Sequence, residues 1–457
     1  MTFLLAERRR PDVVRMARNG WWLAVGTVCL GAFMGQLDAS IVTLTYPALR
    51  VGFNTSLAAV TWVSLSYLLT LVAVLVPVGR FADAYGRKLL YLYGFAVFTL
   101  ASAACGLAPS LPMLVAFRVV QAVGAAMLQA NSVALVACSA PRSVVRAALG
   151  VQAAAQAVGL ALGPTLGGLL VSTIGWRWVF GINIPVGVVA VVAGHYLLPR
   201  THERTPVTGF DWRGLGLLAV ATTSGLLAVS ALSGLGLPDW TTAVLLAVAV
   251  VAAWACYRRQ RSATTPLIDL TLVRAPGVGS GLAGALCGYL VLFGPLVLVP
   301  IVFAHRGPLA AGLVLTALPA GFAVAAATAD RVLPRGWRDR FRCAIGAALS
   351  VLGLAIALPF DTAWLVVGLV VLGVGLGVFT PANNSMIMQS IPNRAAGTGG
   401  GLVNMTRALG TALGVALVTL ALHVSEAPTP ALVLLLAAAL GMVLSVLGTN
   451  RSRNRNM

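Results

Sequence analysis

The sequence predicts an all-α polytopic membrane protein, and composition is the first reason. Of the 457 residues, 59% are apolar and only 9% are charged, whereas a soluble protein of this length needs far more charge to wet its surface. Apolar stretches of about 20 residues, each long enough to cross a hydrocarbon layer of roughly 30 Å, recur from Trp21 to the C-terminus. The net charge of +19 lies in the short loops between these stretches, so it indicates membrane topology and no nucleic-acid partner.

Fourteen transmembrane helices are expected. They cover residues 21–47, 58–78, 88–108, 111–138, 147–171, 178–198, 213–234, 240–257, 277–304, 309–329, 342–359, 362–390, 396–423 and 429–448. Most arginines lie in the N-terminal tail, in the loops after even-numbered spans and in the C-terminal tail. Because basic loops stay in the cytoplasm, we expect a multi-pass protein of the inner (cytoplasmic) membrane with both termini cytoplasmic.

The two longest hydrophilic connections divide the chain. Residues 199–212 and 258–276 enclose two spans with almost no polar residue, which indicates an insertion between two six-helix halves. The expected parts are a cytoplasmic tail (1–20), a six-helix bundle (21–198), two inserted helices (213–257), a second six-helix bundle (277–448) and a C-terminal cytoplasmic tail (449–457).

Asp38 is an acidic residue inside the first span, with no basic residue within about ten positions. A carboxylate at membrane depth costs roughly 2.5–3.5 kcal/mol on insertion scales, so Asp38 needs a partner or a function. Two interpretations stay open. Asp38 is either a helix-end residue that reaches water or a satisfied polar contact, or a protonatable group in a transport pathway.

The connection between the second and third spans reads GRFADAYGRK over residues 79–88. Its two glycines permit a tight turn. Its aspartate can pair with Arg87 or with another helix end, which would form a latch that breaks when the conformation changes. The residues of this expected latch are Gly79, Asp83, Gly86, Arg87 and Lys88.

Two further spans carry regular patterns. In the fifth span, Gly159, Gly163 and Gly167 recur every four residues and give a smooth stripe for close helix approach. Pro164 within this stripe removes a backbone donor and can bend the helix. In the fourth span, Arg118 shares one helical face with Gln121, Ala125, Gln129 and Ser132. A buried arginine needs an acceptor, either a backbone carbonyl or a group in a central cavity.

These motifs occur in the order found in the major facilitator superfamily. Residues 79–88 resemble its motif A, residues 118–124 resemble its motif B with Ala122 in place of a glycine, and residues 159–168 match its antiporter motif C, GxxxGPxxGG. Residues 37–47, LDASIVTLTYP, are similar to the LDxTIVNVALP signature of the fourteen-helix drug:proton antiporters. Residues 176–187 and 399–410 resemble segments of the same branch. The stretch 330–342 is a poor copy of motif A and does not by itself predict a second latch.

The resemblance implies a major facilitator fold with two six-helix bundles and two extra central helices. It implies efflux of small amphipathic or cationic organic compounds, such as drugs and antibiotics, in exchange for protons by alternating access. Asp38 and Arg118 would couple the proton. The antiporter motif (Gly159, Gly163, Pro164, Gly167 and Gly168) would prevent leak. Two alternatives remain: a dedicated exporter of one metabolite or self-made antibiotic, and a non-transporting membrane sensor on the same fold.

Polar and aromatic residues within the spans are candidates for substrate binding. They are Trp62, Tyr67, Gln129, Asn131, Gln156, Tyr289, Asn383, Asn404 and Arg407. Arg407 is close enough to the cytoplasmic end to extend its head group to the interface. The six cysteines have no metal-ligand spacing, and no Walker A sequence is present, so neither a metal, a cofactor nor direct use of ATP is expected. The expected partners are a small organic substrate, protons and the lipid bilayer, and we expect a monomer that is not an enzyme.

Overall fold

The computed structural model describes residues 7, 10–12, 19–201, 209, 211–232, 238–263, 266–268, 270–275, 277–302, 308–334, 336–359, 361–425 and 427–453. Helices make up nearly all of these residues, and none of them is in a strand. The expected tails at 1–20 and 449–457 lie largely outside the described residues.

The first half of the chain contains the first six spans. They are formed by α2 (Trp21–Ile41) with η1 (Val42–Thr45) and α3 (Tyr46–Gly52), α4 (Leu57–Tyr85), α5 (Arg87–Gly106), α6 (Leu111–Ser139), α7 (Val145–Thr173), and α8 (Arg177–Gly181) with α9 (Asn183–Leu197). The first span tightens into a 3₁₀ turn before Pro47, which cannot donate a backbone hydrogen bond to the preceding turn.

The inserted pair and the second half follow. The inserted helices are α10 (Trp212–Leu232) and α11 (Asp239–Ser262), and a short α12 (Leu270–Arg274) leads to the second half. The last six spans are α13 (Val278–Val302), α14 (Pro308–Val332), α15 (Asp339–Ala357), α16 (Thr362–Ser390), α17 (Ala396–Ser425, preceded by η3, Asn393–Ala395) and α18 (Pro428–Arg453).

The prediction of an all-α membrane protein is confirmed. Among the described residues, thirteen helical segments are long and apolar enough to cross a bilayer, and α14 lies where the tenth span was expected at 309–329. Several boundaries differ from the expected ones, and the largest difference is in the second span. It was expected to end at residue 78, but α4 continues to Tyr85 and only Gly86, with φ of 119°, separates it from α5. A glycine adopts this backbone conformation without strain, so the turn needs a single residue.

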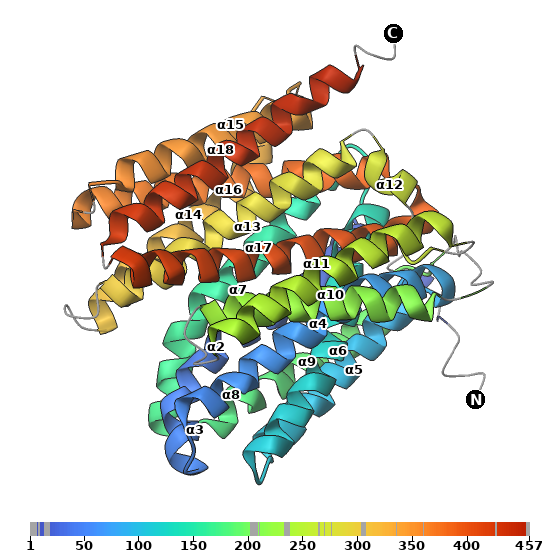
Figure 1. Cartoon of the computed structure of the whole chain (residues 1–457). Coiled ribbons are helices and arrows are strands. Elements are labelled where there is room, and N and C mark those ends of the chain that lie inside the picture. The colour runs from blue at the N-terminus through green and yellow to red at the C-terminus, as the bar shows by residue number, and fades with distance from the viewer. Residues whose placement is uncertain are drawn as a thin grey trace.

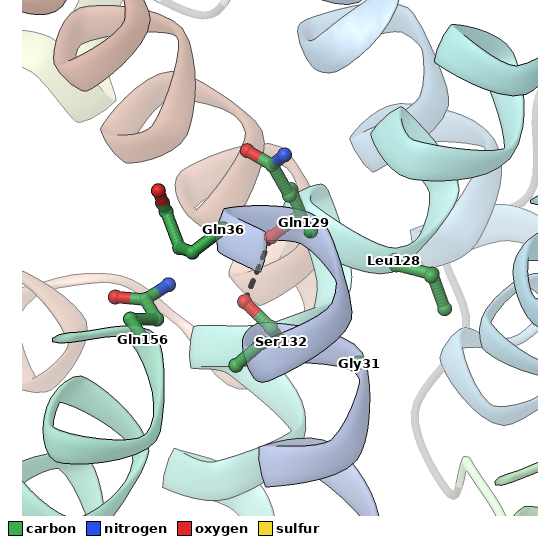
Figure 2. Close-up of a pocket in the computed structure, with 8 residues that line it drawn as sticks. Gly31, Gln36, Leu128, Gln129, Ser132 and Gln156 are labelled. Carbon is green, nitrogen blue, oxygen red and sulfur yellow. Dashed lines mark hydrogen bonds between the residues drawn. The ribbon is translucent and has the colours of Figure 1, made fainter. Parts of the chain in front are cut away.

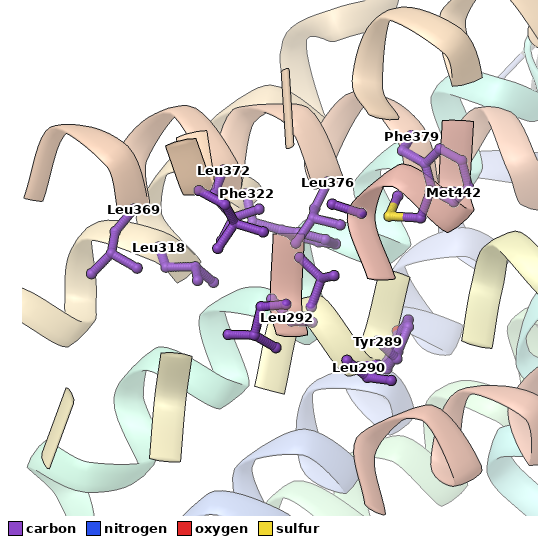
Figure 3. Packing of buried hydrophobic residues seen from close by; sticks show 14 of the residues in the cluster. Tyr289, Leu290, Leu292, Leu318, Phe322, Leu369, Leu372, Leu376, Phe379 and Met442 are labelled. Carbon is purple, nitrogen blue, oxygen red and sulfur yellow. The ribbon is translucent and has the colours of Figure 1, made fainter. Parts of the chain in front are cut away.

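The helices gather into two groups, α2–α9 and α13–α18, with α10 packed on α4 and α17 and α11 packed on α10 (Figure 1). Each group has its own large apolar core. The core of the second group includes Leu318, Phe322, Leu372, Leu376 and Phe379 (Figure 3). Between the groups, α4 packs on α17 and α7 packs on α14.

We call the end of the bundle where α2 begins the inner end, and the sequence predicts that it faces the cytoplasm. The two groups approach each other most closely near this end, where glycines allow backbone contact. A Cβ atom on Gly397 would stand 2.6 Å from the carbonyl oxygen of Gly79, and one on Gly401 would stand 2.7 Å from that of Leu75. The protein is therefore closed at its inner end.

Candidate functional site

Asp38 lies towards the outer end of α2 and is completely buried. Its Oδ2 accepts a hydrogen bond from Arg118 Nη1 at 2.7 Å, and its Oδ1 accepts from Gln121 Nε2 at 3.0 Å and from Asn183 Nδ2 at 3.4 Å. These donors come from α6 and α9. Asp38 is thus an ion-paired carboxylate within the first group of helices: it does not reach water, and it has the satisfied polar contacts that the first interpretation also allowed.

Arg118 is also buried, with 1% of its surface exposed. Its Nε donates to the Val63 carbonyl oxygen at 3.1 Å, and its Nη1 also donates to Gln121 Oε1 at 2.5 Å. The guanidinium carbon lies 4.1 Å from the centroid of the Tyr67 ring. Arg118 therefore has the backbone carbonyl acceptor that the sequence allowed and, in addition, the carboxylate of Asp38.

This arrangement links protonation to rearrangement. The charges of Asp38 and Arg118 cancel while the pair is intact. A proton bound to Asp38 would leave the guanidinium as an uncompensated charge in a region of low dielectric constant, which is costly. The site can bind a proton only if Arg118 finds a new partner or the surrounding helices move.

Closer to the inner end than this pair, α2, α6 and α7 line a small hollow. The side chains of Gln36, Gln129 and Gln156 project from these three helices around it (Figure 2). Gln129 and Gln156 were expected here, but Gln36 was missed. The signal was an amide in an apolar span two positions before Asp38. Because two residues of α-helix turn a side chain by about 200°, Gln36 and Asp38 face different directions.

In the second group, Arg407 is 4% exposed. Its Nη2 donates to Asn384 Oδ1 at 2.8 Å and its Nη1 to Asn404 Oδ1 at 3.2 Å, and the guanidinium carbon lies 5.0 Å from the Tyr289 ring centroid. Although Arg407 is close enough to the inner end to extend towards the interface, its head group is held between α13, α16 and α17. Asn404 Nδ2 also donates to the Gln129 carbonyl oxygen at 2.8 Å, which joins this cluster to the edge of the hollow.

The remaining substrate-binding candidates lie elsewhere. Trp62 is 40% exposed, and Tyr67 lies beneath Arg118. Asn131 donates to the Met127 carbonyl oxygen of its own helix at 2.8 Å, and Asn383 donates to the Gly281 carbonyl oxygen at 2.9 Å. The structure does not place these four residues among those that line the hollow.

At the inner end, Asp83 joins the two groups. Its carboxylate accepts from the backbone N–H groups of Gly397 and Thr398, both at 2.7 Å, and from Thr398 Oγ1 at 2.8 Å. It also pairs with Arg87 at 2.9 Å. The first N–H groups of a helix have no partner within the helix and carry partial positive charge. Asp83 therefore acts as a charged cap on α17 from the other half of the molecule.

The other residues of the expected latch have separate contacts. Arg87 Nη2 donates to the Asn393 carbonyl oxygen, which also crosses between the groups. Lys88 Nζ instead donates to the carbonyl oxygens of His195 and Leu198, both at 2.8 Å, and so stays within the first group. Gly79 lies against Gly397.

A second ionic contact joins the groups at the inner end. Arg146 of α7 binds Asp330 Oδ1 at 2.6 Å and Asp339 Oδ1 at 2.7 Å, and Arg342 lies 3.2 Å from Asp330 Oδ1. The stretch 330–342 therefore supplies an ionic link although its spacing departs from motif A. The missed signal was the presence of two aspartates and Arg342 around one connection, at the end of α14 and the start of α15.

The glycine stripe of α7 faces α2, the helix that carries Asp38. A Cβ on Gly159 would stand 2.6 Å from the Phe33 carbonyl oxygen, and one on Gly163 would stand 2.6 Å from Ser40 Cβ. Gly167 faces Ile41 and Leu44, whereas a Cβ on Gly168 would meet nothing within 4 Å. The backbone of α7 runs through position 164, and the Pro164 side chain lies outside the described residues.

Comparisons with solved structures agree with this architecture. The human organic anion transporter MFSD10 superposes with a TM-score of 0.70 at 16% identity, covering 93% of this chain and 99% of that one. The proton:xylose symporter XylE superposes with a TM-score of 0.64 at 13% identity, covering 93% of this chain and 94% of that one. At these identities the likeness shows the fold alone.

Sequence comparisons cover most of the chain. It is 31% identical to the methylenomycin A resistance protein of Streptomyces coelicolor (87% of this chain, 85% of that protein), and 30% identical to the riboflavin transporter RibZ of Clostridioides difficile (86% and 87%). It is 32% identical to the multidrug resistance protein Stp of Mycobacterium tuberculosis (85% and 73%). Residues 28–415 match the family described as Major Facilitator Superfamily. The chain therefore belongs to the major facilitator superfamily and is similar to its multidrug and antibiotic resistance transporters.

Proposed function

We propose that this transporter exports small amphipathic organic compounds in exchange for protons. Its family consists of multi-pass membrane transporters rather than enzymes, and relatives named for methylenomycin A resistance and multidrug resistance support an efflux role. The observation that carries the proposal is the buried Asp38–Arg118 ion pair between α2 and α6, two helices that also line a hollow with amide groups.

The pair supports exchange because one carboxylate can serve both ligands in turn. Asp38 would take up a proton from the outside, which breaks its pair with Arg118, and would lose that proton when substrate binds, which restores the pair. The site then holds either a proton or a substrate, so the two flows run in opposite directions.

Alternating access would use the contacts at the inner end. In the present conformation the Asp83 cap and the Arg146 ion pairs hold the two groups together there. We propose that residues 21–198 and 277–448 rock as two bundles, with the helices of residues 213–257 outside the cavity. Opening of the inner end, which we propose faces the cytoplasm, would break both contacts and admit substrate to the hollow.

The proposal has two versions, which differ in whether the protein exports many compounds or only one. Among the relatives, Stp is named for multidrug resistance, whereas others are named for methylenomycin A or for riboflavin. Growth of an expressing strain on a panel of unrelated toxic compounds separates the versions. Resistance to many compounds indicates multidrug export, and resistance to one compound indicates a dedicated exporter.

The test of proton coupling uses proteoliposomes that contain the full chain and a pH-sensitive dye. For any compound that the panel identifies, the wild-type protein should move protons when substrate is added, and Asp38→Asn should remove this signal while uphill export stops. Asp361→Asn is the matched control, because Asp361 only caps α16 at an exposed end of the bundle. Unimpaired uphill export by Asp38→Asn would exclude Asp38 as the coupling group.

A further inference from the structure

Arg407 is a buried positive charge with no acidic partner among the residues that the structure describes. Two amide oxygens, from Asn384 and Asn404, accept from its Nη atoms, and Tyr289 offers the face of its ring. Its Nε has no acceptor at all within the described part of the chain. Neutral dipoles compensate a buried charge only in part, so this guanidinium can still bind an anion.

The acidic residues near the centre and the inner end are already engaged. Asp38 pairs with Arg118, Asp83 pairs with Arg87 and caps α17, and Asp330 and Asp339 bind Arg146. Around the hollow the described side chains are amides, a hydroxyl and small apolar groups. Among the described residues, a cationic substrate would therefore meet no unpaired carboxylate there, and the unmatched charge that is linked to the hollow, Arg407, is positive.

Arg407 also occupies a position that opening at the inner end would uncover. Its partner Asn404 contacts the Gln129 carbonyl oxygen of the first group, and Gln129 borders the hollow. If the groups separate at the inner end, this contact breaks and the guanidinium faces the space between them. The stacked rings of Tyr289 and Phe293, with centroids 6.2 Å apart, lie beside it and offer an apolar surface.

We propose that Arg407, with Asn384, Asn404 and Tyr289, binds the acidic group of the exported compound. The substrate would be an organic acid that presents a carboxylate, phenolate or enolate next to a flat apolar body. The planar fork of an arginine matches two oxygens of such a group, and the aromatic rings would contact the flat body. This inference rests on the proposed export function and replaces the expectation of a cationic substrate.

The test measures binding to the purified full chain with matched sets of probes. Each set contains an aromatic carboxylic acid (benzoic, naphthoic or anthracenecarboxylic acid), its methyl ester and the amine with the same ring. At least one acid should bind more tightly than its ester and its amine. Arg407→Gln should weaken binding of that acid about tenfold or more and leave the affinity for the ester unchanged.

Two control variants show whether any change in binding comes from the guanidinium of Arg407. Arg407→Lys keeps the charge without the planar fork, so it should retain part of the preference for the acid. Arg177→Gln removes an exposed arginine whose guanidinium lies 4.5 Å from the Trp176 ring centroid, and it should bind all probes like the wild type. Equal binding of acids and esters, or a preference for acids that survives in Arg407→Gln, would overturn the inference.

Proton movement measured with the same probes separates this inference from the proposed function. Acid binding that depends on Arg407 but moves no protons would support the anion site and contradict antiport. Proton movement driven by esters or amines, and insensitive to Arg407→Gln, would support antiport and contradict the anion site.

Discussion

The two halves of this transporter each bury an arginine within the membrane region, and they neutralise it differently. Arg118 of the first half binds the carboxylate of Asp38 and a backbone carbonyl. Arg407 of the second half binds two asparagine oxygens and lies over a tyrosine ring. The first charge is balanced within its own group of helices, whereas the second depends in part on a contact between the groups through Asn404.

This difference suggests separate roles for the two halves. A balanced pair resists disturbance until a proton removes one of its charges, which suits energy coupling. An unbalanced cation attracts an external anion, which suits recognition of a substrate. The predictions below test this division, beginning with the substitution of largest expected effect.

Neutralising the two arginines should have unequal effects on stability. Arg118→Gln leaves Asp38 buried without its cation and should destabilise the protein by about 3–5 kcal/mol. Arg407→Gln removes a charge that lacks a carboxylate and should cost less than about 1 kcal/mol. Thermal denaturation in detergent measures both. The double variant Arg118→Gln with Asp38→Asn should recover part of the stability that Arg118→Gln loses. Equal losses of stability in Arg118→Gln and Arg407→Gln would contradict the comparison between the two halves.

The two contacts at the inner end should also differ in strength. Asp83→Asn weakens a buried cap on α17 and should favour the inner-open form by about 10- to 100-fold, because hydrogen bonds to a charged group are strong. Asp330→Asn breaks an ion pair whose aspartate is 24% exposed, so its effect should stay below about fivefold.

The rate of thiol alkylation measures this equilibrium, with Ser132→Cys as the reporter in the hollow and the native cysteines replaced. The reagent is added at the inner end. Equal rates in the Asp83 and Asp330 variants would show that the buried cap is no stronger than the half-exposed ion pair.

In each half, a helix that carries one of these charged residues packs closely on its neighbour through glycines. Substitution of these glycines by alanine should therefore destabilise both halves. A Cβ on Gly159 would stand 2.6 Å from the Phe33 carbonyl oxygen, and one on Gly414 would stand 2.5 Å from that of Leu290. Alanine at either position should destabilise the protein by about 1–3 kcal/mol. Gly168→Ala is the control, because nothing lies within 4 Å. An equal effect at all three positions would rule out close helix approach as the reason for the stripe.

The smallest expected effects concern two aromatic residues of the first half. Tyr67→Leu removes the ring beneath Arg118 and should lower stability by about 0.5–2 kcal/mol. Trp62→Leu changes a residue that is 40% exposed, and export rates should stay within about twofold of the wild type. A large loss of export in Trp62→Leu would return this residue to the set that binds substrate.

Local properties of the chain explain which predictions could be made from the sequence. Spans are recognisable because about 20 apolar residues suffice to cross a bilayer wherever they occur in the chain. The Gly86 turn and the glycine stripe of α7 follow from short spacings, and Asp38 was recognisable because an acidic residue in an apolar span is rare. These signals predicted the fold class and several residues that now lie in the Asp38 site and at the inner end.

Contacts between residues far apart in the chain could not be predicted from the sequence. The spacing along α6 shows that Arg118 and Gln121 share a face, but not that this face meets Asp38, 80 positions earlier in the chain. Likewise, the pairing of Asp83 with the start of α17 spans 314 positions. The sequence shows the amide of Gln36 and the aspartates of residues 330–342, but their places beside the hollow and against Arg146 depend on how the helices assemble.

The sequence by itself determined that the chain is a bundle of membrane helices and which polar groups enter the membrane region, because transfer into a bilayer acts on each segment separately. The tertiary structure decided which of those groups are neutralised. Asp38 and Arg118 compensate each other, and Arg407 keeps a charge that the described residues leave without an anion. The physical reason is that compensation of a buried charge depends on distances of about 3 Å between helices, which no local pattern specifies.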